Sequence, residues 1–207
     1  MRGREDELAH VNERLGALAH GQGCVVLVEG ASGLGTSRLR GEALLRARRQ
    51  GVRTLSATGD ALSRTVSLGM LLEALSRRTE RPSDLGALQR LATEPDQRFC
   101  LLEELGERLL AAAAGEPLVI ALDGVHWADP VTLMALRALP LRFAAQPICW
   151  LLARRPGAGD ADLRRTINRL RDAGASTIRL KPIRDPRRAP GSGGARALAP
   201  ARAAVAP

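Results

Sequence analysis

The sequence predicts an α/β fold, a three-layer sandwich in which a mostly parallel five-stranded sheet carries helices on both faces. Short apolar runs alternate along the chain with stretches of helical periodicity. Residues 118–122, the clearest run, contain no polar residue, as expected for a strand buried on both faces. Strands that alternate with helices are joined by crossovers, which place helices on both sides of a parallel sheet.

The elements follow one another in a regular order. The predicted strands comprise residues 25–28, 52–57, 118–122, 148–153 and 176–180. The predicted helices comprise residues 36–50, 68–78, 98–114, a stretch opened by Asp129 and Pro130, and residues 160–173. Asp129 is a good N-cap and Pro130 suits the first helical position. The segment that carries Pro82, Gly86 and Pro95 is predicted to be a loop, because proline and glycine interrupt helices.

Length and composition indicate one cytoplasmic domain. The chain has 207 residues, enough for one sizeable core. It contains no apolar run near the roughly 18 residues that span a membrane, and its charged N-terminus does not resemble a signal peptide. The three cysteines lie far apart without metal-ligand spacing, which indicates reduced core thiols.

The net charge of +9 is concentrated near the C-terminus. Residues 179–207 hold seven basic residues and one acid, a net +6, so the rest of the chain gives little support to nucleic-acid binding. Residues 184–207 are rich in Ala, Pro, Arg and Gly, and we expect a disordered tail there because they offer little to bury. Residues 1–183 then form the single folded domain.

Residues 30–37, Gly-Ala-Ser-Gly-Leu-Gly-Thr-Ser, follow the first strand and open a helix. Their spacing is that of G-x-x-x-x-G-K-[ST], the P-loop, whose backbone N–H groups surround phosphate at a helix N-terminus. This motif predicts a P-loop NTPase fold that binds ATP or ADP. The expected nucleotide-binding residues of this segment are Gly30, Ala31, Ser32, Gly33, Leu34, Gly35, Thr36, Ser37 and Arg38.

Thr36 stands where the motif requires lysine. A hydrogen bond from a charged group contributes about 1.5–3 kcal/mol, so its loss weakens binding on the order of 10- to 100-fold. Arg38 comes one residue too late on the helix to replace that charge. The backbone loop and the helix dipole remain, so weak binding is expected. A glycine-rich turn with no ligand stays an open alternative.

Asp123 ends the apolar strand 118–122, in the usual place of the carboxylate that partners a phosphate loop. There it would hold Mg²⁺ through water beside the Ser37 hydroxyl. The next position, which often carries a second acid that orients the attacking water, is Gly124. We therefore expect Asp123 to be catalytic and metal-binding, and hydrolysis to suffer more than binding.

Several blocks resemble one family. Residues 123–130, Asp-Gly-Val-His-Trp-Ala-Asp-Pro, resemble the D-D-x-H-W-A-D-P segment of the large ATP-binding LuxR-type transcriptional regulators, whose signal-transduction P-loop ATPase domain is related to AAA+ and origin-recognition proteins. Residues 3–8 resemble the opening G-R-E-x-E-L box of that family, and residues 151–156 resemble its fourth strand. The resemblance implies that Arg4 and Glu5 lie near adenine and that Arg155 senses phosphate.

The same resemblance implies parts that this sequence lacks. The family continues into a helical sensor region and a DNA-binding helix-turn-helix, which do not follow Pro182, so a truncated or frameshifted regulator is our hypothesis for the tail. The leading functional hypothesis is a regulatory domain that binds ATP or ADP with Mg²⁺ but hydrolyses little. A functional ATPase with substituted groups and a nucleotide-free scaffold or remnant are the alternatives. Protein partners and self-association are left open.

Overall fold

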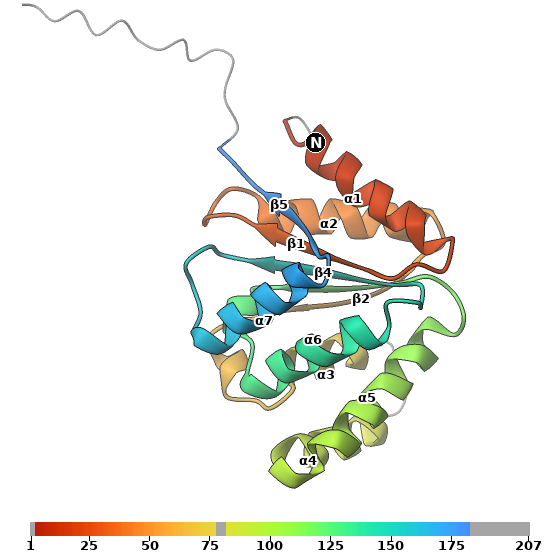
Figure 1. Ribbon diagram of the computed structural model, residues 1–207, viewed down its shortest axis with the longest axis vertical. Helices are drawn as coiled ribbons and strands as arrows, with labels where there is room; N and C mark the ends of the chain where they lie inside the picture. The colour runs from red at the N-terminus through yellow and green to blue at the C-terminus, as the bar shows by residue number, and fades with distance from the viewer. Residues whose placement is uncertain (1–2, 78–81, 183–207) are drawn as a thin grey trace, which may run out of the picture.

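The computed structural model describes residues 3–77 and 82–182 (Figure 1). The predicted tail, residues 184–207, lies outside them. No helix in the described ranges is long and apolar enough to cross a membrane.

Five strands form one sheet in the order β2-β3-β4-β1-β5. Their bounds are β1 Cys24–Glu29, β2 Arg53–Thr58, β3 Leu118–Asp123, β4 Ile148–Arg154 and β5 Ser176–Arg179. Every pairing in the sheet is parallel, and β3 is buried along its whole length. The predicted α/β fold with a five-stranded sheet is confirmed.

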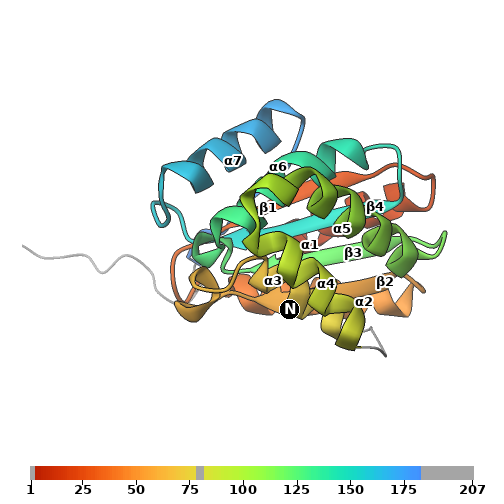
Figure 2. The same ribbon diagram turned by 90° about the horizontal axis from the view of Figure 1, so that it is seen from below.

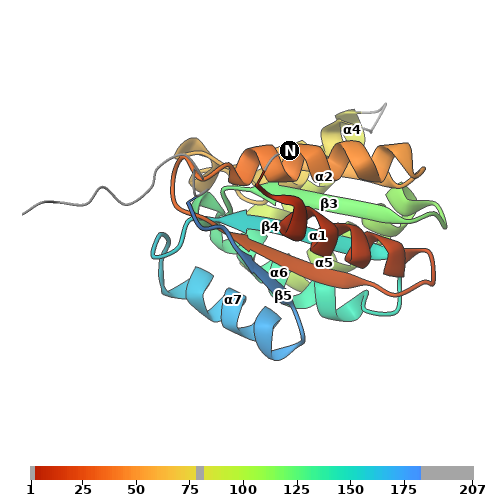
Figure 3. The same cartoon turned by 90° about the horizontal axis from the view of Figure 1, so that it is seen from above.

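Helices cover both faces of the sheet (Figures 1, 2 and 3). Two of them, α1 Glu5–Leu18 and α2 Thr36–Arg49, lie on one face (Figure 3). The other face carries α3 Gly69–Ser76, α4 Pro82–Thr93, α5 Arg98–Ala113, α6 Pro130–Arg142 and α7 Ala161–Asp172 (Figure 2). Short 3₁₀ turns occur at η1 Leu62–Arg64, η2 Pro95–Gln97 and η3 Val125–Trp127.

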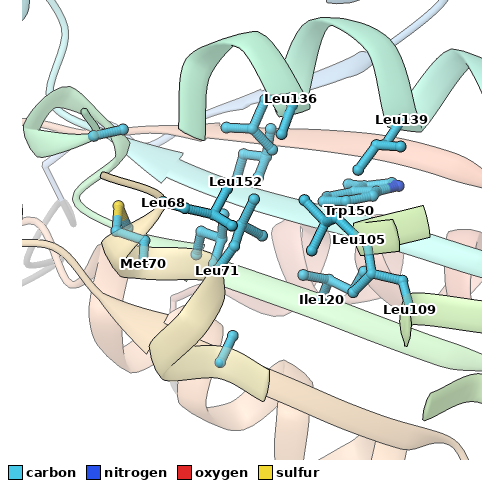
Figure 4. Close-up of a cluster of buried hydrophobic side chains, with 14 of the residues drawn as sticks. Leu68, Met70, Leu71, Leu105, Leu109, Ile120, Leu136, Leu139, Trp150 and Leu152 are labelled. Atoms are coloured by element: carbon cyan, nitrogen blue, oxygen red, sulfur yellow. The ribbon is translucent and has the colours of Figure 1, made fainter. Parts of the chain in front are cut away.

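The sheet separates two hydrophobic cores because successive side chains of a strand point to opposite faces. In β4, Cys149 and Leu151 pack with α1 and α2, whereas Trp150 and Leu152 pack with the larger layer. Figure 4 shows Trp150 among leucines of α5 and α6, namely Leu105, Leu109 and Leu139. Burial on both sides explains why the central strands are continuous apolar runs.

The loop predicted around Pro82 and Gly86 is wrong, because residues Pro82–Thr93 form the helix α4. Proline is tolerated in the first turn of a helix, where its missing N–H would have no intrahelical partner. Leu88 is fully buried, and Leu85 and Leu91, three residues to each side, pack against the same core. Tertiary burial of this apolar face outweighs the cost of about 1 kcal/mol for a glycine inside a helix.

The capped start of α6 is confirmed. The carboxylate of Asp129 accepts hydrogen bonds from the backbone N–H groups of Val131 and Thr132, at 2.9 and 3.0 Å. It also accepts one from the N–H of Leu68 at 2.9 Å, which joins the start of α6 to the start of α3. Asp129 thereby holds the segment after β3 in place beside the carboxyl ends of the strands.

Candidate functional site

A pocket of about 390 Å³ opens at the carboxyl ends of β1, β2, β3 and β4. Ligands of open parallel sheets bind at this edge. The pocket is lined by Gly30, Ala31, Ser32, Gly33, Gly35, Thr36, Ser37, Thr58, Gly59, Asp123, Gly124, His126, Trp127, Arg154 and Arg155. Residues separated by more than a hundred positions in the sequence therefore meet in one cavity, and the phosphate loop predicted from the sequence forms one of its walls.

The loop between β1 and α2 has the backbone that its glycines predict. Gly33 and Gly35 have φ angles of +81° and +87°, a left-handed region that is costly for other residues. Gly35 is the N-cap residue of α2, so the positive end of the helix dipole lies beside the pocket. This geometry suits an anion.

Gly30 begins the loop in a position where a side chain would not fit. A Cβ atom there would lie 2.8 Å from the Thr36 hydroxyl oxygen and 3.3 Å from the Cβ of Leu180. The N–H of Gly30 donates to the carbonyl oxygen of Arg154 at 3.2 Å, which anchors the loop to β4. Thr36 thus packs its hydroxyl toward the start of the loop and brings no positive charge to the pocket.

Asp123 ends β3 on the pocket floor and is 8% exposed. Its carboxylate lies 3.8 Å from Nε of Arg40, which is on α2. Ser37 also lines the pocket, but in residues 3–77 and 82–182 no group of three or more His, Cys, Asp and Glu could hold a metal ion. Mg²⁺ bound with a nucleotide needs only one or two carboxylates beside phosphate oxygens and waters, so the feature of this site that opposes the ion is the guanidinium facing Asp123.

The two arginines at the end of β4 differ in their partners. Arg154 donates to Oε1 of Glu29 from Nε at 2.9 Å and from Nη2 at 2.6 Å. Arg171 and Arg179 approach the same carboxylate at 2.6 and 3.4 Å. Arg155 is exposed and lines the pocket. Since Arg154 is committed to a buried carboxylate, Arg155 is the better placed of the two to meet an anion.

His126 and Trp127 both line the pocket. The ring nitrogen Nδ1 of His126 accepts the backbone N–H of Arg155 at 3.5 Å. Burial, followed by the positive charge of Arg155, lowers the pKa of His126 below its ordinary value, which favours the neutral imidazole. The guanidinium of Arg64 stacks 6.0 Å from the Trp127 ring centroid.

Four residues expected to contact nucleotide lie outside the lining of this pocket, namely Arg4, Glu5, Leu34 and Arg38. Arg4 is 3% exposed and donates to the carbonyl oxygens of Leu34 and Lys181 at 3.0 and 2.6 Å. It therefore ties the start of α1 to the phosphate loop and to the segment that follows β5. Glu5 is exposed at the first position of α1, and Arg38 is exposed on α2.

The family model of the AAA ATPase domain matches residues 1–151, which include the loop, β3 and most of β4. The chain belongs to the AAA ATPase domain family. Domains of this family bind nucleotide, typically with Mg²⁺. A search of curated proteins finds no match to the chain.

Solved structures resemble this AAA domain in fold. A chain of the Escherichia coli MS115-1 HORMA:CdnC:Trip13 complex has a TM-score of 0.53 at 12% identity, covering 86% of this chain and 63% of that one. A chain of Drosophila ORC bound to DNA has a TM-score of 0.52 at 15% identity, covering 87% of this chain and 43% of that one. The AAA domain thus spans about half the length of these proteins, and at such identities the likeness shows the fold alone.

Several residues that line the pocket of the AAA domain were not predicted from the sequence. Thr58 ends β2, where the register pairs it with Asp123, and Gly59 follows it. Adjacent parallel strands end at the same edge of a sheet, so residues at the end of β2 would be expected near Asp123 once β2 is known to lie beside β3. Local sequence patterns do not contain that strand order.

Proposed function

We propose that this AAA domain is an ATP- or ADP-binding regulatory domain with a weakened phosphate loop and little hydrolysis. The observation that carries the proposal is the pocket of about 390 Å³ between the loop and Asp123. In this proposal, phosphates lie against the loop and the N-terminus of α2, and Arg155 meets the outer phosphate. Arg4 supports the loop through Leu34 and does not touch the base.

Slow hydrolysis follows from what the pocket lacks. A catalytic water needs a group that accepts its proton or orients it, and Gly124 offers no side chain at the place of the usual second acid. Loss of the charge at Thr36 also leaves the developing negative charge on phosphate less stabilised. A domain that holds nucleotide without rapid turnover suits regulation, and the segment 123–130 supports an origin in a LuxR-type regulator.

One observation favours a second candidate, an ATPase with substituted groups. His126 lines the pocket, and burial and Arg155 lower its pKa, which favours the neutral imidazole. Because Nδ1 accepts the backbone N–H of Arg155, the neutral ring carries its proton on Nε2 and could donate a hydrogen bond to a phosphate oxygen in the transition state. Steady-state phosphate release separates the candidates. Turnover of about 1 s⁻¹ is the low end for typical enzymes. If the natural protein reaches that rate and His126→Asn abolishes it, the ATPase is favoured.

The proposal is tested by restoring the missing charge. Thr36→Lys should tighten ATP binding in calorimetry by about ten-fold or more, because a charged hydrogen bond contributes about 1.5–3 kcal/mol. Thr93→Lys is the matched control, since it adds the same charge at an exposed helix end outside the pocket.

Equal ATP affinity in a folded Thr36→Lys protein and in the control would show that phosphate does not bind at this loop. Failure of both the natural protein and Thr36→Lys to bind ATP or ADP would favour the nucleotide-free scaffold instead.

A further inference from the structure

Arg40 lies on α2 beside Asp123, which lines the pocket. Its Nη1 donates to the carbonyl oxygen of Ala57 at 3.0 Å and to the hydroxyl of Thr58 at 3.1 Å. These two bonds hold the guanidinium against the end of β2, and its Nε lies 3.8 Å from Oδ2 of Asp123. The side chains of Arg40 and Asp123 are only 17% and 12% exposed, so water screens the pair weakly.

The arrangement follows from the helix and the sheet together. Arg40 lies three residues after Ser37 on α2, and residues three apart lie on the same face of a helix. The register between β2 and β3 sets Thr58 beside Asp123, so an arginine anchored at Thr58 must approach the carboxylate. The Nε of Arg40 is buried and makes no hydrogen bond among the described residues, and the nearby acid is what offsets its charge.

Resting on the proposed function, we propose that Arg40 is the permanent counter-ion of Asp123 and that this domain binds nucleotide without Mg²⁺. A guanidinium carries a permanent positive charge in proteins, and the bonds to Ala57 and Thr58 hold that of Arg40 beside Asp123. Mg²⁺ binds through carboxylates and phosphates and needs near-octahedral oxygen ligands. Here the single carboxylate of the pocket floor is neutralised by a fixed charge that also repels a second cation.

The ligand class is therefore a nucleoside di- or triphosphate taken as the free anion. Its charge is met by the backbone N–H groups at the start of α2 and by Arg155, which lines the pocket. Gly124 supplies no second carboxylate that could recruit a metal in place of Asp123.

The test compares ADP binding by calorimetry in excess EDTA and in saturating Mg²⁺. The natural protein should bind with the same dissociation constant in both, within about two-fold. Arg40→Ala frees the carboxylate and should bind about ten-fold more tightly with Mg²⁺ than with EDTA. Adding Asp123→Asn to Arg40→Ala should remove that difference.

Arg46→Ala is the control, because Arg46 pairs with Glu42 on the same helix at 3.1 Å, outside the pocket lining. It should stay indifferent to Mg²⁺. If Arg40→Ala does not fold, Arg40→Gln keeps a hydrogen-bond donor toward Ala57 and removes the charge. The signal of Mn²⁺ in electron paramagnetic resonance gives a second readout: ADP should recruit the ion to Arg40→Ala and not to the natural protein.

The outcomes separate this inference from the proposed function. Natural protein that binds ADP about ten-fold more tightly with Mg²⁺ overturns the inference and leaves the nucleotide site intact. So does an Arg40→Ala protein that remains indifferent to Mg²⁺. Where natural binding is too weak to measure, the same comparison is made in the Thr36→Lys background, and absence of binding there overturns both proposals.

Discussion

At the scale of single residues, position 124 lacks the second acid that phosphate-loop enzymes often carry, and its backbone conformation also requires glycine. Its φ angle is +68°, and a Cβ atom there would lie 2.7 Å from the carbonyl oxygen of Gly59. The same contact exists in reverse, because a Cβ on Gly59 would lie 2.8 Å from the carbonyl oxygen of Gly124. The two glycines let the ends of β2 and β3 approach closely, so a carboxylate cannot be restored at position 124 without moving this backbone.

Gly124→Ala should therefore destabilise the protein more than glycine-to-alanine at an open left-handed position. Gly51→Ala is the matched control, with a φ angle of +78° and nothing within 4 Å of a new Cβ. The control should cost about 1–2 kcal/mol for the left-handed backbone. Gly124→Ala should cost about 1–3 kcal/mol more, from overpacking against carbonyl oxygen. Urea unfolding measures both, and equal losses would contradict the close contact.

At the scale of elements, Glu29 joins four of them. It ends β1, is 5% exposed, and meets Arg154 of β4, Arg171 of α7 and Arg179 of β5. Burial by itself would raise the pKa of Glu29, but the hydrogen bond from Arg154 and the charges of Arg154 and Arg171 outweigh it and hold the pKa below its ordinary value. The cluster fixes the position of β1 immediately before the phosphate loop.

This lowered pKa predicts a pH dependence of stability. The folded protein binds this proton less readily than the unfolded chain, so the contribution of Glu29 is complete above the unfolded pKa and is lost as the pH falls through the folded pKa. Glu29→Gln should cost about 3 kcal/mol at pH 7, mainly by leaving the charge of Arg154, whose side chain is 12% exposed, uncompensated. The difference from the natural protein should shrink as the pH falls below the ordinary carboxyl range.

Denaturant unfolding between pH 7 and pH 3 measures the difference. Glu42→Gln is the control, because its pair with Arg46 is about one third exposed and such pairs contribute at most about 1 kcal/mol. A Glu29→Gln penalty that stays constant down to pH 3 would show that ionisation of Glu29 is not its source.

At the scale of the whole molecule, the two hydrophobic cores share one sheet. Strands β1, β3 and β4 each contribute side chains to both cores. The buried residues of β2, Leu55 and Ala57, belong to the larger core. If the helices on one face lost their packing, they would expose strands that also support the helices on the other face. We therefore expect the domain to unfold as one cooperative unit, as most domains of this size do.

Two substitutions on opposite faces test this cooperativity. Leu8→Ala removes packing between α1 and the sheet, and Leu105→Ala removes packing beside Trp150 on the other face. Each should lower stability by about 2–5 kcal/mol. Each should also shift the circular dichroism and tryptophan fluorescence transitions together. A Leu8→Ala protein whose fluorescence transition stays in place while its dichroism transition moves would show that the cores unfold separately.

The sequence by itself determined the features that depend on neighbouring residues. Apolar runs marked β1, β3 and β4, since burial on both faces favours continuous apolar sequence. Glycine spacing marked the loop at residues 30–37, because left-handed backbone favours glycine. Asp129 and Pro130 marked the start of α6. Each of these signals lies within a few residues of the structure that it predicts.

Only the tertiary structure decided which distant residues meet. Helix α4 forms despite Pro82 and Gly86 because a core made by other elements buries Leu88. Arg40 reaches Asp123 because the sheet places β2 beside β3, and Gly124 faces Gly59 for the same reason. Contacts of this kind depend on strand order and on how each crossover packs, and these are set by the free energy of the whole fold, which no local stretch of sequence contains.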